Sequence, residues 1–415
     1  MCGVVALLLS LGALLVLSVP ERACAQERFV QRVEVSGILR TREATLLDLL
    51  PRSPPALYAV GEIEEFERRI SNLEIFDSVS VRVDESVLRV EVCEKWSLIP
   101  EFDLATGTSF QDTYVMLGLT EYNFLGLAAS LGLSVYHEQR GWGFYLIYQE
   151  HVYRRKRWAF GGETSYETAE YRFRDGASWV MAQGLGSLWT TSPPLGSDHL
   201  RLELGMTYMH QKPHEVMAEV RPSDGHVLAG AITFTVDDYV WHDLAPRGFL
   251  LNLTFRPGLF VEASGVQQRL RGDLEGVASL RLSRYTALMT RIVGGIVNLG
   301  NANNSLLIGS AEGVRGLEDA WYFTWAQTFA NVELRQAIPL GGRWALQAVL
   351  FADTGVFERI DSHGQRDLAH FAFSGGGGIR IVPTWLSGLV PRFDVARLMT
   401  PTRTVFYQFG VSQYF

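Results

Sequence analysis

The residues that could catalyse a reaction do not form a recognisable catalytic pattern. His210 and His214 are four apart, but Pro213 prevents the helix that would bring their rings together, and no glutamate follows His210 as a general base. The glycine run 375–378 lacks the Lys-Ser/Thr pair of a phosphate-binding loop, so we expect it to relieve crowding or to bend a strand. No Gly-x-Ser-x-Gly motif is present. The sequence predicts no enzyme, no catalytic residue, no metal site and no cofactor.

Two carboxylates, Glu333 and Asp353, stand in a pattern that does have chemical meaning. In an extended strand, each would point to the face opposite its apolar neighbours. For Glu333 these neighbours are Ala330, Val332 and Leu334, and for Asp353 they are Trp344, Leu346, Ala348 and Leu350. In a membrane barrel both carboxylates would face the lumen, because a charge facing lipid near the midplane costs about 2–4 kcal/mol. An arginine brought into that lumen could pair with such a carboxylate in bidentate geometry.

Alternation of apolar and polar residues extends over most of the chain after Trp96. It is clearest in the segments 129–135, 199–208, 249–256, 344–350 and 405–411. A soluble β-sandwich would alternate in the same way, but the stretch 96–415 is too long for one sandwich. No apolar run after Val19 is long enough for a membrane helix, so a membrane protein of this kind must be a closed barrel. At roughly 20 residues for each strand and its turn, we expect about sixteen antiparallel strands.

The composition agrees with such a barrel. Hydrophobic residues make up 47% of the 415 residues and aromatic residues 12%, with 40 glycines. The mean hydropathy is only +0.07, as expected where the two faces of each strand cancel. The excess of Trp and Tyr suits interfacial girdles better than a ligand site. The net charge of −8 argues against a nucleic-acid-binding protein.

The first 25 residues read as a secretory signal peptide. An apolar run from Val4 to Val19 is followed by Ala23-Cys24-Ala25, which resembles a cleavage site. Cleavage would leave Cys93 alone, so we expect no intrachain disulfide, and its alternating surroundings favour a strand position over a reactive thiol. We expect the mature chain in the outer membrane of a Gram-negative bacterium.

Residues 26–95 form a compact α+β unit in our interpretation, ahead of a barrel at 96–415. The pattern predicts a strand around Val33 and Val35 that closes at Ser36-Gly37, then a helix from Glu43 to Leu50. A second helix begins at Gly61 and places Ile63, Phe66 and Ile70 on one face. Two strands, 79–83 and 87–92, complete the unit as a hairpin.

This arrangement resembles the BamA/TamA-like outer-membrane protein assembly factor superfamily, to which the two-partner-secretion transporters are related. Residues 29–95 are similar to its periplasmic POTRA domain, with 73–79 (LEIFDSV) before the final hairpin. Within the barrel, 121–126 (EYNFLG) resembles the family's early N-x-x-G turn, and Asp237-Asp238 with Pro246-Arg247-Gly248 resembles a later hairpin. The segments 378–380 and 391–396 resemble the last hairpin. The resemblance implies a sixteen-stranded barrel behind one small POTRA-like domain.

The strongest part of the resemblance is Val314-Arg315-Gly316, which is similar to the V-R-G-[FY] tip of the family's long sixth loop. It implies that Arg315 and Gly316 fold back into the lumen and that Glu333 and Asp353 hold the arginine there. Composition alone favours a solvated loop arginine at Arg315, with the two carboxylates merely lining a water-filled lumen. Leu317 replaces the family's aromatic residue at the next position. The aromatic C-terminal residues resemble the family's assembly signal and are Tyr407, Phe409 and Phe415.

The resemblance implies an insertase or translocase for proteins of the outer membrane. Residues 29–95 would receive an unfolded client or periplasmic accessory proteins, and the barrel would contact the lipid bilayer, with no nucleotide and no nucleic acid involved. A passive pore or a scaffold barrel remains the alternative, because assembly factors usually carry several POTRA domains and this chain has one such unit.

Overall fold

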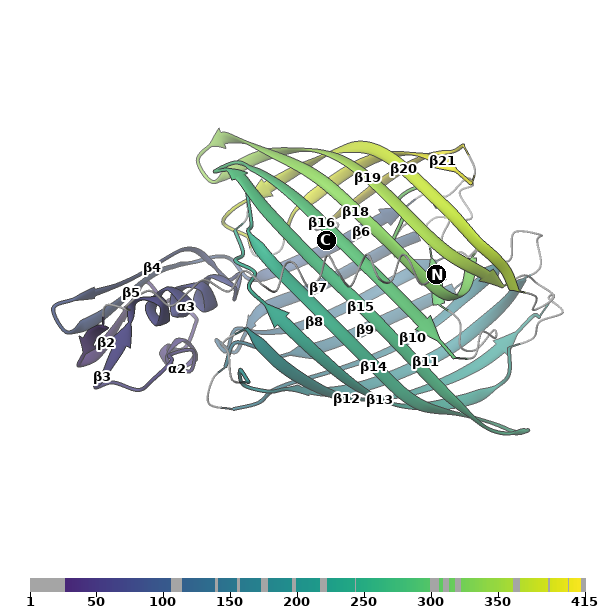
Figure 1. Cartoon of the computed structure of the whole chain (residues 1–415), viewed down its shortest axis with the longest axis horizontal. Helices are drawn as coiled ribbons and strands as arrows, with labels where there is room; N and C mark the ends of the chain where they lie inside the picture. Colours follow the sequence, from purple (N-terminus) through teal and green to yellow (C-terminus); the bar gives the residue numbers. More distant parts are fainter. Residues whose placement is uncertain are drawn as a thin grey trace.

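The computed structural model describes residues 27–105, 114–138, 141–154, 157–172, 178–195, 199–216, 222–242, 244–298, 306–308, 313–317, 322–360, 366–386, 389–401 and 403–411. It shows a closed barrel of antiparallel strands with a small α+β segment at one end (Figure 1). The expected signal peptide and Phe415 lie outside the described residues. We call the barrel end that carries the α+β segment the domain end, and the opposite end the far end.

The α+β segment follows the sequence pattern and adds one feature to it. Its elements in chain order are β1 (Glu27–Val30), β2 (Arg32–Ser36), α2 (Glu43–Leu47), β3 (Ala56–Ala59), α3 (Val60–Ser71), β4 (Phe76–Asp84) and β5 (Val87–Glu94). The expected strands and helices are present, but α2 ends at Leu47 instead of Leu50, and Cys93 lies in β5. The added feature is the pairing of β1 with β3, two four-residue strands that are too short to show a period.

The segment has one apolar core and a sheet with free edges. The buried side chains Leu46 of α2 and Phe66 and Ile70 of α3 pack in one cluster with Leu88 and Val90 of β5. The sheet order is β2-β5-β4, with β2 parallel to β5 and β4 antiparallel to it. Each of the two outer strands therefore leaves one edge without a strand partner in the described structure.

Sixteen strands form the barrel wall, as the sequence predicted. They are β6 (Leu98–Ala105), β7 (Tyr114–Phe124), β8 (Ala129–Glu138), β9 (Gly141–Gln149), β10 (Ala159–Arg172), β11 (Ser178–Thr191), β12 (Leu200–His214), β13 (Gly225–Asp237), β14 (Gly248–Glu262), β15 (Gly265–Ser283), β16 (Thr286–Val297), β18 (Tyr322–Gly341), β19 (Trp344–Ile360), β20 (Arg366–Pro383), β21 (Pro391–Thr400) and β22 (Val405–Val411). The short β17 (Leu306–Ile308) pairs with β18 beyond the β16–β18 ladder.

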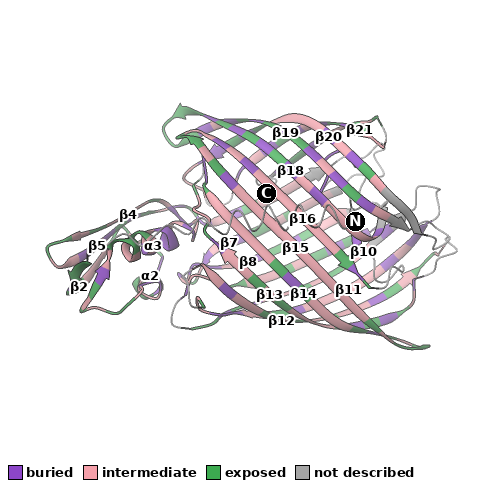
Figure 2. Cartoon of the chain, viewed as in Figure 1, coloured by how far each residue is buried: buried purple, intermediate pink, exposed green. Residues whose placement is uncertain are grey.

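The two faces of the wall have opposite chemistry. Large apolar side chains on alternate positions are exposed on the outside, such as Met206 at 58%, Leu253 at 54% and Leu350 at 66%. Their neighbours in the chain point inward and are largely polar or small, and Figure 2 shows buried and exposed positions interleaved along the strands. An apolar exterior around a polar interior is the arrangement of an outer-membrane β-barrel. None of the helices in the described ranges has the length and hydropathy that a membrane crossing requires.

The barrel closes between its first and last strands by a short ladder. In the described part of the chain, β22 pairs with β6 at two positions, Gln408 with Ala105 and Phe409 with Leu104. By contrast, β14 pairs with β15 along its whole length, from Gly248 with Ser279 to Glu262 with Gly265. The β6–β22 seam therefore has few backbone hydrogen bonds in the described structure.

Candidate functional site

The segment 313–317 lies inside the barrel, where Arg315 meets Glu333 of β18 and Asp353 of β19. The Arg315 guanidinium donates from Nε to Asp353 Oδ2 at 2.8 Å and from Nη2 to Asp353 Oδ1 at 2.9 Å, which is a bidentate pair. Its Nη1 donates to Glu333 Oε1 at 2.7 Å, and its backbone N–H donates to Asp353 Oδ2 at 3.2 Å. All three side chains are completely buried. The structure thus brings these three predicted residues together.

A second layer of charges surrounds this cluster. Arg335 contacts Glu333 Oε2 at 2.6 Å, and Arg380 of β20 pairs with Asp394 of β21 at 2.6 Å and lies 3.8 Å from Glu333. Three arginines thus face three carboxylates, and these charges balance. Buried ions are stable only where partners and hydrogen bonds compensate their lost hydration, and here each carboxylate has several donors. Arg335, Arg380 and Asp394 had no role in the sequence interpretation.

Apolar packing also holds the segment. The Arg315 guanidinium carbon lies 3.4 Å from the centroid of the Phe351 ring. Val314 and Leu317 are buried in an apolar cluster with Phe329, Phe357, Ala372 and Leu398. Leu317, which stands where the resembling family has an aromatic residue, therefore still anchors the segment. Gly316 has a φ of +94°, a conformation that favours glycine at the turn.

The glycine run 375–378 of β20 makes room for this cluster. Gly376 and Gly378 face the lumen, and a Cβ at Gly378 would lie 1.9 Å from Asp394 Oδ1 and 2.8 Å from Arg380 Nη1. A Cβ at Gly376 would meet the Phe351 ring at 2.5 Å. Gly375 and Gly377 point the other way, and at Gly375 the closest approach is an ordinary 3.7 Å. The run therefore relieves crowding, as the sequence suggested, because the ion pairs lie against the bare backbone.

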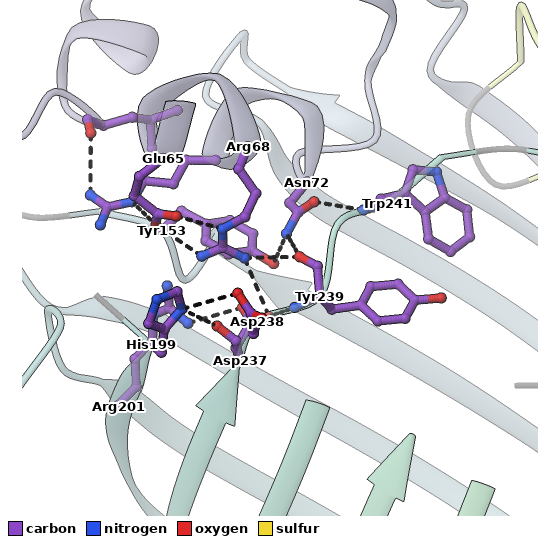
Figure 3. A network of polar contacts seen from close by, with 12 residues as sticks. Glu65, Arg68, Asn72, Tyr153, His199, Arg201, Asp237, Asp238, Tyr239 and Trp241 are labelled. Carbon is purple, nitrogen blue, oxygen red and sulfur yellow. Dashed lines mark hydrogen bonds and ion pairs between the residues drawn. The ribbon is translucent and has the colours of Figure 1, made fainter. Parts of the chain in front are cut away.

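A second polar network connects α3 to turns at the domain end of the barrel (Figure 3). Arg68 donates to the Tyr239 carbonyl at 2.8 Å and reaches Asp237 at 3.4 Å, and Arg201 of β12 pairs with the same carboxylate at 3.1 Å. Asn72 donates to the Tyr239 carbonyl at 2.7 Å and accepts from the backbone N–H of Trp241 at 2.9 Å. One helix face is thus bonded to the β13–β14 turn.

Electrostatics reinforce this contact. Arg68 and Arg201 both lie over the Tyr153 ring, at 5.9 and 4.9 Å from its centroid. The pKa of the Glu65 carboxyl is lower than usual. Burial alone would raise this pKa, but the hydrogen bond and positive charge of Arg68 and the charge of Arg69 lower it by more. Burial alone would lower the pKa of Arg68, but Glu65 and Asp237 raise it above its usual value. Glu65 and Arg68 are therefore both charged at neutral pH.

The chain from Arg40 to Thr45 makes the other main contact with the domain end, on the β7–β8 turn. Arg40 pairs with Glu121 at 2.7 Å, and Asn123 donates to the Thr41 hydroxyl at 2.9 Å. Thr45 donates to the Gly126 carbonyl at 2.9 Å. Gly126 has a φ of +73°, and a Cβ there would lie 2.4 Å from the Arg40 carbonyl oxygen. The N-x-x-G turn seen in the sequence is thus a contact for the α+β segment.

The structure places one further sequence motif and part of the proposed assembly signal. Asp237, which the sequence singled out as part of a hairpin motif, is the carboxylate that α3 binds. The sequence interpretation missed the residues that dock the α+β segment, Arg40, Arg68 and Asn72. The signal that could have indicated them is the pair of adjacent arginines, Arg68 and Arg69, beside the apolar face of a helix. Of the proposed assembly signal, Tyr407 and Phe409 lie on the outer face of β22, and the Phe409 ring lies 6.0 Å from Phe102 across the seam.

The described residues give no sign of a metal site. No group of three or more His, Cys, Asp and Glu side chains in the described ranges could hold a metal ion. His210 and His214 lie along strand β12, and His210 stacks on His226 of β13 at 4.6 Å between ring centroids.

Comparison with known proteins identifies the fold. No family model and no curated protein matches the chain. Among solved structures, CdiB from Escherichia coli has a TM-score of 0.66 at 14% identity, covering 92% of this chain and 76% of that one. CdiB from Acinetobacter baumannii has a TM-score of 0.62 at 11% identity, over 93% and 74%. BamA from Haemophilus ducreyi lacking POTRA domains 1–3 has a TM-score of 0.53 at 15% identity, over 92% and 84%. The chain therefore has the fold of these sixteen-stranded outer-membrane barrels.

Proposed function

We propose that this protein inserts polypeptides into the outer membrane or passes them across it. The α+β segment, a single POTRA-like domain in the periplasm, would bind an unfolded client as an added strand at the free edge of β2 or β4. The observation that carries the proposal is the β6–β22 seam, which pairs at two positions in the described structure. A barrel wall can open most readily where the fewest backbone hydrogen bonds must break.

The fixed position of the segment supports this role. Because α3 and the chain 40–45 are bonded to two different turns, the α+β segment is held against the domain end of the barrel. A client strand bound there would be presented to the lumen or to the seam. No nucleotide is needed in this scheme, since the folding of the client supplies the free energy.

The decisive experiment locks the seam. In the double variant Ala105→Cys with Gln408→Cys, placed in a Cys93→Ser background, an oxidant would join two strands at a paired position. We expect depletion of the wild-type protein to reduce the level of one or several outer-membrane proteins, and the oxidised variant to leave that defect uncorrected. Reduction should restore the activity. Correction of the defect by the oxidised variant would refute opening at the seam.

A passive pore is the second candidate, favoured by the polar inner wall of β12–β16. A hollow of about 380 Å³ there is lined by Thr, Asn, Arg and acidic side chains, and polar walls of this kind suit water and ions. A pore would show a large, steady conductance in planar bilayers, and depletion would leave the outer-membrane proteome unchanged.

A further inference from the structure

The inner wall of β6–β10 carries negative charge. Glu101 of β6 and Glu163 and Glu167 of β10 face the lumen, since their neighbours in the chain point outward. The Tyr145 hydroxyl donates to Glu163 at 2.8 Å and the Tyr136 hydroxyl donates to Glu167 at 2.7 Å. No lysine or arginine stands at a lumen-facing position in the described parts of these five strands. We call Glu101, Glu163 and Glu167 the acidic sector.

The inner wall of β14–β16 carries the opposite charge. Four of its lumen-facing cations form what we call the arginine sector, and they are Arg256, Arg269, Arg271 and Arg291. A fifth, Arg281, lies at the domain end and donates to the Ala245 carbonyl at 2.6 Å. Two carboxylates stand among them: Asp273 pairs with Arg256 and with Arg271, the latter at 2.9 Å, and Glu275 pairs with Arg291 at 2.8 Å. Glu203 of β12 lines the same hollow as Arg256, Arg271 and Arg291, so the four arginines face three carboxylates. This sector also remains partly open to solvent, with the Arg256 side chain 41% exposed.

The two sectors are separate parts of one lumen. Three strands, β11, β12 and β13, lie between them on the shorter way round the barrel. The cluster around Arg315 does not cancel the division, because its three arginines and three carboxylates balance. A low-dielectric wall around such a division strengthens the field between the two sectors.

We infer that the lumen is a charge-divided conduit that orients an extended polypeptide, with the acidic edge of the peptide toward the arginine sector and its basic edge toward the acidic sector. Successive side chains of an extended chain point to opposite sides, so a segment with acidic and basic residues in alternation has two such edges. This inference rests on the proposed function for its ligand class. The charge division itself can be tested without any insertion or transport activity.

The first test measures the sign of the potential at two lumen positions. Single thiols are placed in the full chain, in a Cys93→Ser background, as Ser165→Cys between Glu163 and Glu167, or as Thr233→Cys, which lines the hollow with Arg256. Each is modified with a cationic and an anionic methanethiosulfonate of similar size. We expect the ratio of cationic to anionic rates to be at least about tenfold higher in the Ser165→Cys variant, since potentials of several kT arise in such clefts.

The control for this test is salt, because at 1 M ionic strength the Debye length is about 3 Å and the difference should shrink. Gel mobility before and after heating reports whether each variant is folded, and Ser134→Cys and Asn252→Cys are second variants for the two walls. Equal rate ratios at both walls would overturn the charge division. That outcome would leave the proposed function standing.

The second test addresses orientation. Two synthetic peptides of equal composition are used as probes, one with Lys and Glu in strict alternation and one with all Lys before all Glu. We expect the alternating peptide to slow the modification of both thiols several-fold more than the block peptide. Equal slowing by the two peptides, or no slowing by either, would overturn the orienting role.

Discussion

Removal of the Arg315 side chain should destabilise the barrel by an amount typical of a broken buried ion pair. In the Arg315→Ala variant, Glu333 and Asp353 lose the guanidinium that contacts both of them. Water cannot replace it at once, because neither side chain has any exposed surface. Leaving one partner of a buried pair uncompensated costs about 3–5 kcal/mol. Asp353 should account for most of this cost, since Glu333 keeps its contact with Arg335 at 2.6 Å.

The assay is the retained gel mobility of the folded barrel as a function of temperature or urea. Arg291→Ala is the matched control, because it also removes a lumen arginine that pairs with a carboxylate, at 2.8 Å from Glu275, and lies over a phenylalanine ring. That pair is partly exposed, so its loss should cost at most about 1 kcal/mol. Arg315→Lys should recover only part of the stability, because an ammonium cannot make the bidentate pair.

A double-mutant cycle separates the pair from the rest of the site. If the cost comes from the stranded carboxylate, the Arg315→Ala and Asp353→Ala double variant should lose less than the two single losses added together. Reversing the charge with Asp353→Lys should be at least as harmful as Arg315→Ala. The reasoning is wrong if Arg315→Ala and Arg291→Ala lower the stability equally, or if the two single losses simply add.

Three further predictions address the surroundings of this site and the docking of the α+β segment. Gly378→Ala should lower the melting temperature of the barrel and weaken the Arg380–Asp394 pair, because a Cβ there would lie 1.9 Å from the Asp394 carboxylate. Gly375→Ala should be close to neutral, because a Cβ there meets nothing closer than 3.7 Å, and similar melting curves for the two variants would contradict this reasoning. Arg68→Ala should release α3 from the β13–β14 turn and speed tryptic cleavage after the buried Lys95. The control Arg82→Ala breaks an exposed pair with Glu91 and should leave the cleavage rate unchanged, and an unchanged rate in Arg68→Ala would argue against docking through this residue. The pKa of Glu65 is lower in the folded protein than its usual value of 4.5, so its contribution to docking is fully present above pH 4.5 and is lost as the pH falls through the lower, folded-state pKa. Exposure of the tryptic site after acid pulses should therefore rise only below about pH 4.5. The Glu65→Gln variant should lose this pH dependence.

Much of the fold could be predicted because alternation with period two is a property of each strand alone. The patterns at Leu200–Tyr208 and Phe249–Arg256 indicate which side chains face lipid, whichever strands are their neighbours. Parity likewise placed Glu333 and Asp353 on the inner face. Helix α3 was predictable for the same reason, since Phe66 and Ile70 recur at helical spacing.

The contacts between distant segments could not be predicted in this way. Arg68 and Tyr239 are 171 residues apart, and their hydrogen bond depends on where the barrel places the β13–β14 turn. The hydrogen bond between Thr45 and Gly126 likewise depends on the tertiary structure, because it forms only when the α+β segment docks on the β7–β8 turn.

The sequence by itself therefore determined the strands, their inward and outward faces, and the charged residues available to the lumen, since these follow from local periodicity and the cost of exposing charge to lipid. Only the tertiary structure decided the pairings. Strand register sets Asp394 beside Gly378 and Asp353 opposite Asn331, and the return of segment 313–317 into the lumen brings Arg315 to both carboxylates. Register and loop path depend on the closure of the whole barrel, and no single segment carries that information.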